Sequence, residues 1–464
     1  MSNASALRQH PPRRDRGDTA TLAVVAVATA LVLIIFTTPL ATIVPTTQAL
    51  GASAGQEAWL LAAMPMGAAT GLLGAGALGD DRGRRIVFLW GLGVMAVASM
   101  IAAAAPTALV VILARIAQGL GGAAVIACGL GLLGVVFPAG RPRVRATGIW
   151  AAALGAGVAI GPILAALCTA FGGWRAAYWS TGLLAFALLL AGHAVVPHED
   201  ENAPRRVDWL GTALLMAGLA MFMSSLTEMR LGLVRPTVLL LFAGGLLAIL
   251  VFILVEVRHR DPIIDLALFR HADFAGATFA AFASGAGVLA TMSLVPTLLT
   301  RTLESSALTA AFVLCAWSAT SVVTALGARW IPERITPRLL LVAGLAACAI
   351  AQLMLYAPSA EGSVLQVLPS LFLAGAANGV LNAALGRQAV ATVPQDRTAM
   401  GSGANNTARY LGSAIGITLG AVLIAHGADV GGLPGLLTGW NETVLATAGF
   451  SILGAVVVAV ARDR

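Results

Sequence analysis

The sequence predicts an all-α membrane protein with fourteen transmembrane helices, on the basis of three observations. Of its 464 residues, 58% are hydrophobic and 11% are charged, whereas soluble globular chains are roughly 45–50% apolar and about 25% charged. The apolar residues gather in runs of about twenty, the length of helix that spans a bilayer core. The arginines lie mostly in alternate connections between these runs. Because a backbone in lipid must satisfy its own hydrogen bonds, we expect the runs to be helices.

Fourteen apolar runs are long enough to be membrane spans. Leu22–Val44 and Val238–Val255 show the pattern most clearly. A β-barrel would need shorter segments of alternating hydrophobicity instead. In chain order, the predicted spans are residues 21–44, 58–79, 86–105, 107–137, 146–170, 175–197, 208–228, 236–257, 274–299, 308–328, 338–357, 364–386, 398–425 and 441–461.

The distribution of arginine predicts how these spans are oriented. The chain contains no lysine, and 22 of its 28 basic residues lie in the two tails and in alternate connections. The other connections hold four: Arg175, Arg230, Arg235 and Arg301. By the positive-inside rule, the arginine-rich connections and both termini are cytoplasmic, in a plasma-membrane protein. This distribution accounts for the net charge of +7 without a nucleic-acid partner.

The connection after the second span carries glycines and charges at fixed spacing. It reads Gly76-Ala-Leu-Gly-Asp80-Asp-Arg-Gly83-Arg84-Arg85 and resembles the loop signature of the major facilitator superfamily. Gly76 permits a close helix approach, Gly83 permits a turn, and Asp80 can pair with an arginine or cap a helix N-terminus. We expect these residues to form a cytoplasmic gate, with Asp80 and Arg84 acting between the halves. The alternative is a charged loop that only stabilises topology.

Span four contains Arg115-Ile-Ala-Gln118-Gly119-Leu-Gly121, which resembles a second motif of the same superfamily. An arginine inside an apolar helix is costly and usually functional. The alternative is a structural cation that donates to backbone carbonyls.

Span five contains Gly148, Gly157, Gly161 and Pro162 at the spacing of the signature that marks exporters in this superfamily. Small residues four apart allow helices to approach closely, and proline bends the span. We expect Gly157 and Gly161 to lie where span five meets the opposite half of the molecule. The alternative is generic packing of small residues.

Three later segments resemble the fourteen-span drug:proton antiporter branch: Asp208-Trp209-Leu-Gly211, Asp261-Pro262-Ile-Ile-Asp265 and Gly401-Ser-Gly403-Ala-Asn405-Asn406-Thr-Ala-Arg409. The resemblance runs from about residue 21 to 461 and implies the major facilitator fold, with two pseudo-symmetric six-helix bundles and an inserted helix pair. The implied parts are a cytoplasmic tail (1–20), an N-terminal bundle (21–197), a linker with the inserted pair (198–258), an amphipathic cytoplasmic linker (259–273) and a C-terminal bundle (274–464).

Span one departs from this branch at the residue that matters most for coupling. The branch usually carries an aspartate where this chain has Phe36, and of the neighbouring motif only Thr38 fits. Since a buried carboxylate is the simplest proton carrier, proton coupling is implied here by the resemblance alone. The remaining acidic candidates lie near span ends: Glu57, Asp208 and Glu228.

Polar side chains within spans identify a candidate central cavity and coupling site: Thr38, Arg115, Gln118, Asn378, Asn382, Asn405, Asn406 and Arg409. Arg115 and Arg409 lie deepest, one in each half, with no acid at comparable depth. If both face the cavity, its potential is positive, and it should accept neutral and anionic amphiphiles better than cations. The alternative is that backbone carbonyls or a carboxylate such as Glu228 offset each arginine.

The combined features predict a secondary transporter that exports small amphipathic molecules, drugs or secondary metabolites, by proton antiport. We expect no cofactor, a monomer, and the substrate and bilayer as partners. The alternatives are a lipid or glycolipid exporter, or a transporter not coupled to protons. The six histidines are scattered, so we expect neither an enzyme nor a metal site. The loops are too short for the soluble domain of a sensor.

Overall fold

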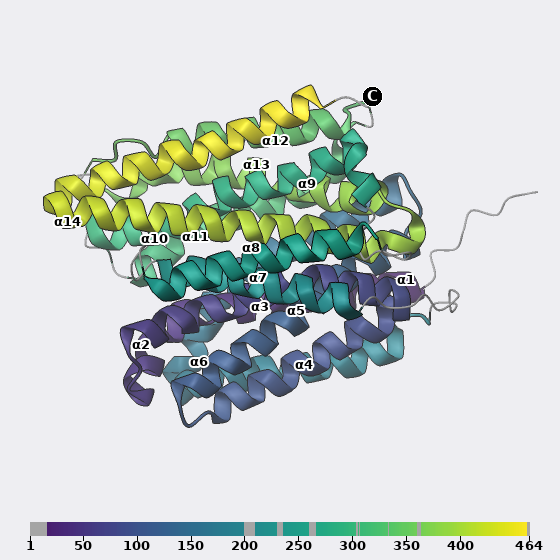
Figure 1. Ribbon diagram of the computed structural model, residues 1–464, viewed down its shortest axis with the longest axis horizontal. Coiled ribbons are helices and arrows are strands. Elements are labelled where there is room, and N and C mark those ends of the chain that lie inside the picture. The colour runs from purple at the N-terminus through teal and green to yellow at the C-terminus, as the bar shows by residue number, and fades with distance from the viewer. Residues whose placement is uncertain are drawn as a thin grey trace, which may run out of the picture.

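The computed structural model describes residues 16–198, 209–229, 235–258, 266–302, 305, 307–332, 334–359 and 363–461. Regular secondary structure within these ranges is entirely helical. The long helices lie side by side and nearly parallel (Figure 1). Twelve of the described helices are long and apolar enough to cross a bilayer, so the protein is a multi-pass membrane protein.

The N-terminal half consists of α1 (Arg16–Thr37), α2 (Pro39–Leu50), α3 (Ala54–Arg82), α4 (Arg84–Ala104), α5 (Ala108–Val136) and α6 (Arg141–Val195). A capping box formed by Ser53 and Gln56 starts α3. Gly83 separates α3 from α4 with a φ of +101°, which side-chain-bearing residues rarely adopt. α6 is broken at Gly172 and Gly173.

The inserted pair consists of α7 (Trp209–Met229) and α8 (Pro236–Glu256). The C-terminal half consists of η1 (Leu266–Arg270), α9 (Ala272–Ser284), the π-helical turn η2 (Gly285–Leu289), α10 (Ala290–Thr302), α11 (Ala307–Gly327), η3 (Ala328–Trp330), α12 (Pro337–Leu353), η4 (Val364–Val367), α13 (Leu368–Ala391), η5 (Gln395–Arg397) and α14 (Thr398–Val460). α14 is broken at Gly432, so it contributes two spans.

The predicted spans correspond to helices, with two qualifications. The first predicted span, 21–44, is wrong at its end, because α1 stops at Thr37 and Pro39 opens α2. Proline cannot donate to the preceding turn and favours the first turn of a new helix. The count of fourteen spans stays a prediction. α6 is counted as one span although it is 55 residues long and has a central break, and α12 is not among the twelve because it is shorter than the others. Of the predicted linker at 198–207, only residue 198 is described, whereas residues 266–273 of the predicted linker at 259–273 are described and contain η1 and the start of α9.

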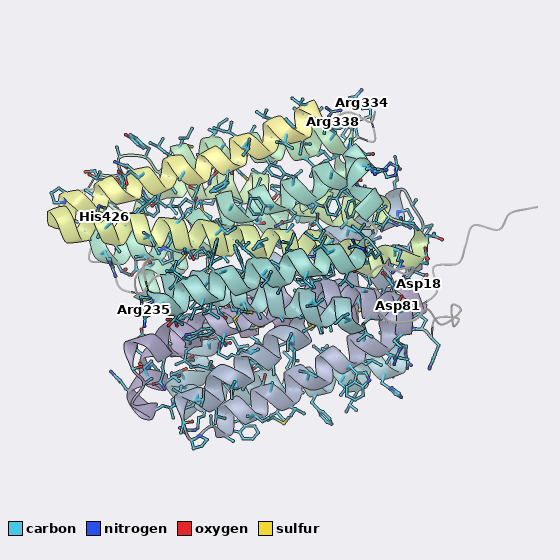
Figure 2. All side chains as sticks on the ribbon, in the orientation of Figure 1. Asp18, Asp81, Arg235, Arg334, Arg338 and His426 are labelled. Carbon is cyan, nitrogen blue, oxygen red and sulfur yellow. The ribbon has the colours of Figure 1, made fainter. Side chains whose placement is uncertain are left out.

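The two ends of the molecule differ in their charged residues. Asp18, Asp81, Arg334 and Arg338 lie at one end, whereas Arg235 and His426 lie at the other (Figure 2). We call the first end the arginine-rich end. This separation follows the alternation of connections in the sequence, and the arginine-rich end is the one predicted to be cytoplasmic.

Two large apolar clusters form the core, and the inserted pair contacts both halves. Trp150 and Phe88 belong to a cluster that is centred on the N-terminal half and also includes Ala389 and Val390 of α13, whereas Trp440 belongs to a cluster of the C-terminal half. α7 contacts α3 through the hydrogen bond from Ser224 Oγ to Met66 Sδ, and it contacts α14 through the bond from Thr418 Oγ1 to the Leu226 carbonyl. Only 17% of the most apolar stretch of α8 is buried, which is typical of a lipid-facing helix.

Candidate functional site

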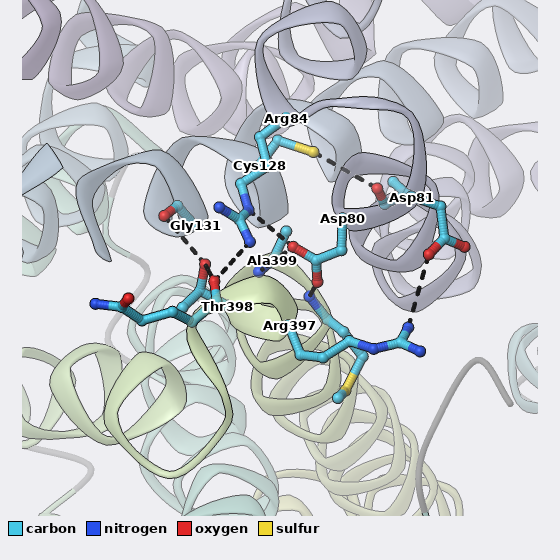
Figure 3. Close-up of polar contacts among 11 residues, drawn as sticks. Asp80, Asp81, Arg84, Cys128, Gly131, Arg397, Thr398 and Ala399 are labelled. Atoms are coloured by element: carbon cyan, nitrogen blue, oxygen red, sulfur yellow. Dashed lines mark hydrogen bonds and ion pairs between the residues drawn. The ribbon is translucent and has the colours of Figure 1, made fainter. Parts of the chain in front are cut away.

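Asp80 joins the two halves at the arginine-rich end (Figure 3). Its carboxylate accepts hydrogen bonds from the backbone N–H groups of Ala399 (3.1 Å) and Met400 (2.7 Å) in the first turn of α14. It also accepts a bond of 2.8 Å from Nε of Arg84. The side chain of Asp80 is 1% exposed. An acid at this place satisfies the free N–H groups of a helix N-terminus and complements its dipole.

Two further contacts connect the halves beside Asp80. Arg84 Nη2 donates to the Gln395 carbonyl at 2.8 Å, and Arg397 Nη1 lies 3.8 Å from Asp81 Oδ1. Gly76 allows this approach, because a Cβ added there would lie 2.5 Å from the Ala399 carbonyl oxygen. The motif is thus the place where α3 and α14 meet, and its role as a moving gate remains a prediction.

The sequence predicted that Arg85 belongs to the gate, but its side chain does not take part in this connection between the halves. Its Nε donates to the Val196 carbonyl at 2.9 Å, Nη2 donates to the His193 carbonyl at 2.8 Å, and Nη1 lies 2.8 Å from His198 Nε2. It therefore binds the C-terminal end of α6 within the N-terminal half. A cation at the free carbonyls of a helix C-terminus is stabilising.

The glycines of span five contradict the expectation about their packing partner. A Cβ added at Gly157 would collide with the Ala30 carbonyl of α1, and one added at Gly161 would collide with Thr37 Oγ1. Both therefore pack α6 against α1 in the same half. Gly148 instead faces the opposite half, where an added Cβ would lie 3.0 Å from the Ala325 carbonyl oxygen of α11. Pro162 follows Gly161 on the same helix.

Arg115 is fully buried in the N-terminal half. Its Nη1 and Nη2 donate weakly to the Ile35 and Phe36 carbonyls of α1, at 3.4 and 3.5 Å. Gln118, one turn further along α5, donates to Ser99 Oγ of α4 at 2.9 Å. These two side chains therefore point to different neighbours within one half. For Arg115, the contacts to backbone carbonyls match the alternative stated from the sequence.

Arg409 is held by two amide side chains in the C-terminal half. Its Nη1 donates to Asn382 Oδ1 at 3.1 Å, and its Nη2 donates to Asn406 Oδ1 at 2.7 Å. Asn405 points away and donates to the Ala277 carbonyl of α9, while Asn378 donates to Ser321 Oγ of α11 at 3.4 Å. The sequence therefore identified the polar residues, of which the structure brings three together.

Phe36 and Tyr410 form an aromatic contact between the two halves, with ring centroids 6.4 Å apart. Phe36 accepts the bond from Arg115 through its carbonyl, and Tyr410 follows Arg409 in α14. Thr38, two residues from Phe36, is buried and donates to the Ile34 carbonyl. Arg115 therefore contacts the backbone of Phe36, and the guanidinium carbon of Arg409 lies 5.7 Å from the centroid of the Tyr410 ring.

Comparison with known proteins identifies the family. A family model described as the Major Facilitator Superfamily matches residues 22–417 and, in a second match, residues 277–464. The chain belongs to the major facilitator superfamily. The multidrug resistance protein Stp of Mycobacterium tuberculosis is 29% identical over 371 residues, which are 79% of this chain and 68% of that protein. The cephamycin export protein CmcT of Amycolatopsis lactamdurans is 28% identical over 97% of this chain and 94% of its own.

Solved structures of major facilitator proteins share the fold. The crystal structure of the human organic anion transporter MFSD10 matches with a TM-score of 0.68 at 16% identity, covering 95% of this chain and all of that one. The proton:xylose symporter XylE matches with a TM-score of 0.68 at 13% identity, covering 95% and 94%. At these identities the likeness concerns the fold alone.

In this major facilitator protein, the two acidic candidates that the structure describes pair with neither buried arginine. Glu57 is exposed in the first turn of α3. Glu228 of α7 accepts a hydrogen bond of 2.9 Å from Trp59 Nε1 and pairs with Arg235 at 2.9 Å, so it is not the partner of either buried arginine. Asp208 lies outside the described residues. Sequence reasoning missed Glu256, the last residue of α8, which is 2% exposed and is the only acid in that apolar run.

A second buried polar group in the C-terminal half was also missed. Gln352 of α12 donates to Thr291 Oγ1 and accepts from Ser451 Oγ, at 3.0 and 2.8 Å. Thr291 in turn donates to Thr447 Oγ1. The presence of Gln352 inside the predicted span 338–357 could have indicated this buried polar group. Among the described residues, no group of three or more His, Cys, Asp or Glu side chains is placed to hold a metal ion.

Proposed function

We propose that this protein is a secondary transporter that exports small amphipathic molecules, drugs or secondary metabolites, from the cell. The observation that carries the proposal is the contact of Asp80 with the first turn of α14, because it closes one end of the molecule between the two halves. A carrier that alternates between two open ends needs such a separable contact. The names of the relatives support the direction of transport, since they describe multidrug resistance and antibiotic export.

The proposed energy source is a proton gradient, exchanged against the substrate without a cofactor. In this proposal the proton carrier is one of the three acids Glu57, Asp208 and Glu228. The acid that the branch usually carries in span one is replaced by Phe36, so this chain must carry the proton elsewhere.

Transport by the purified protein in proteoliposomes tests both parts. With an acidic lumen, we expect fluorescent amphiphiles to accumulate inside, and we expect a protonophore to abolish that accumulation. Empty liposomes and liposomes without a pH gradient are the controls. Accumulation that ignores the gradient would reject proton coupling. Movement of a labelled phospholipid but of no soluble dye would reject drug export in favour of lipid export.

We also propose that the protein works as a monomer with both termini in the cytoplasm. The arginine-rich end supports this orientation through the positive-inside rule. Reporter fusions at residue 464 and in the connection at Arg235 should report opposite sides of the membrane. Light scattering of the detergent-solubilised protein should give the mass of one chain.

A further inference from the structure

We propose that Arg409 binds the negatively charged group of the substrate, so that amphipathic anions are preferred over amphipathic cations. This inference rests on the proposed export function and specifies its substrate class. It concerns soluble amphiphiles that carry a carboxylate, sulfonate or phosphate group on an apolar body.

The buried interior contains two cations that are not balanced by an acidic side chain. Arg115 and Arg409 form no ion pair with any acidic residue that the structure describes. The acids of neighbouring helices are already engaged, Asp80 with Arg84 and Glu228 with Arg235. A buried guanidinium without a carboxylate is costly, and such residues usually mark a substrate or ion path. The interior between the halves therefore has an excess of positive charge.

The two buried arginines differ in the groups that hold them. Arg115 donates to the backbone carbonyls of Ile35 and Phe36. Arg409 is also buried, but it donates to the neutral side-chain amides of Asn382 and Asn406. Arg115 therefore contributes to the local potential, whereas Arg409 is the arginine that we assign to the ligand.

Arg409 has N–H donors that its protein partners do not use. A guanidinium has five N–H donors. Two of them are used by Asn382 and Asn406, which orient the group without neutralising its charge because both amides are neutral. Nε of Arg409 is buried and has no partner. An oriented guanidinium with spare donors suits a carboxylate or phosphate group.

Aromatic side chains lie beside this cation. Phe36 and Tyr410 face each other across the halves, with Tyr410 next to Arg409 in α14. Phe36 is apolar and uncharged, so this position supplies no negative charge that would attract a cation. Aromatic rings beside an oriented cation match an amphiphile with an anionic head.

A purely structural Arg409, which only ties α13 to α14, is the competing explanation. Replacing Asn382 with aspartate separates the two explanations, because it keeps the tie and removes the net charge. Gln388→Glu is the matched control: it adds the same charge to α13, six residues further along, and none of the bonds to Arg409 involve Gln388.

The test measures binding and export for three dyes of similar size, one anionic, one neutral and one cationic. Equilibrium dialysis with the detergent-solubilised full chain reports binding, and proteoliposomes report export. In the wild type we expect the anion to bind about tenfold more tightly than the cation. Asn382→Asp should abolish this preference, and Gln388→Glu should retain it. If Asn382→Asp does not fold, Asn406→Asp makes the same change from α14.

A wild type that prefers the cation, or an anion preference that survives Asn382→Asp, would overturn the assignment. If the anion is preferred in binding and Asn382→Asp abolishes that preference, but no dye is exported, the export function fails while this site stands. A labelled anionic phospholipid is the last arm: binding of this lipid with no binding of the soluble anion would overturn the assignment to soluble amphiphiles.

Discussion

Asp80 offers its two carboxylate oxygens to donors on two different helices, Arg84 on α4 and the backbone of Ala399 and Met400 on α14. Hydrogen bonds to a charged group contribute about 1.5–3 kcal/mol each. The same residue thus satisfies a buried arginine and a helix N-terminus, which ties the conformation of the arginine-rich end to a single side chain.

The variant Asp80→Asn should therefore impair transport without preventing folding. Asparagine keeps the size and one acceptor oxygen but loses the charge, so the closed conformation is weakened by about 1.5–3 kcal/mol, and we expect a fall in transport of roughly tenfold. Dye export in proteoliposomes, normalised to the protein in the membrane, measures it. Asp81→Asn is the control: its 3.8 Å pair with Arg397 should contribute at most about 1 kcal/mol. Equal export by Asp80→Asn and wild type would refute a gating role.

At the scale of helices, the glycine stripe of α6 shows how closely two segments approach within one half. Gly157 and Gly161 each face the backbone or a side chain of α1 at a separation that leaves no room for a Cβ. Close approach through small residues replaces the hydrophobic driving force that lipid cannot provide. This stripe therefore belongs to the stability of the N-terminal half.

A leucine at position 157 should consequently destabilise the protein. Overpacking of a tight contact costs about 1–3 kcal/mol, and we expect a lower thermal unfolding midpoint for Gly157→Leu in detergent. Gly449→Leu is the matched control, because nothing lies within 4 Å of a Cβ added at Gly449 of α14. Export that stops while the unfolding midpoint stays unchanged would contradict this interpretation and favour a contact between the halves.

The elements and the Asp80 site could largely be predicted from the sequence, but the rotation of helices could not. Runs of apolar residues determine where helices lie. The motif at Asp80 predicted an arginine partner or a helix cap as alternatives, and the structure contains both contacts. A glycine stripe in a helix rich in small residues does not show which neighbour it faces. The same holds for Gln118, which faces α4, and for Arg85, which binds α6. Both contacts depend on how the helices are rotated when they pack, which the sequence pattern of one helix does not show.

Across the whole molecule, the halves also contact each other near the arginine-rich end through Gly134 of α5 and Val390 of α13. A Cβ added at Gly134 would lie 3.2 Å from the Cβ of Val390. This separation is near the range of about 3.5–4.5 Å found in disulfides.

The pair Gly134→Cys and Val390→Cys, in a background without the four native cysteines, should therefore form a disulfide on oxidation. We expect the crosslinked protein to stop transporting, because the halves can no longer separate at this end, and we expect a reductant to restore transport. Electrophoretic mobility after cleavage between the halves reports the crosslink, and the single-cysteine variants are the controls. Transport that continues in the fully crosslinked protein would show that this end does not open.

The closure around Asp80 also bears on leakage across the membrane. In the present conformation the arginine-rich end is held shut by contacts within the chain itself. A carrier with this end sealed offers ions no continuous route through the bilayer. The cell can then keep many copies in its membrane without dissipating its electrochemical potential.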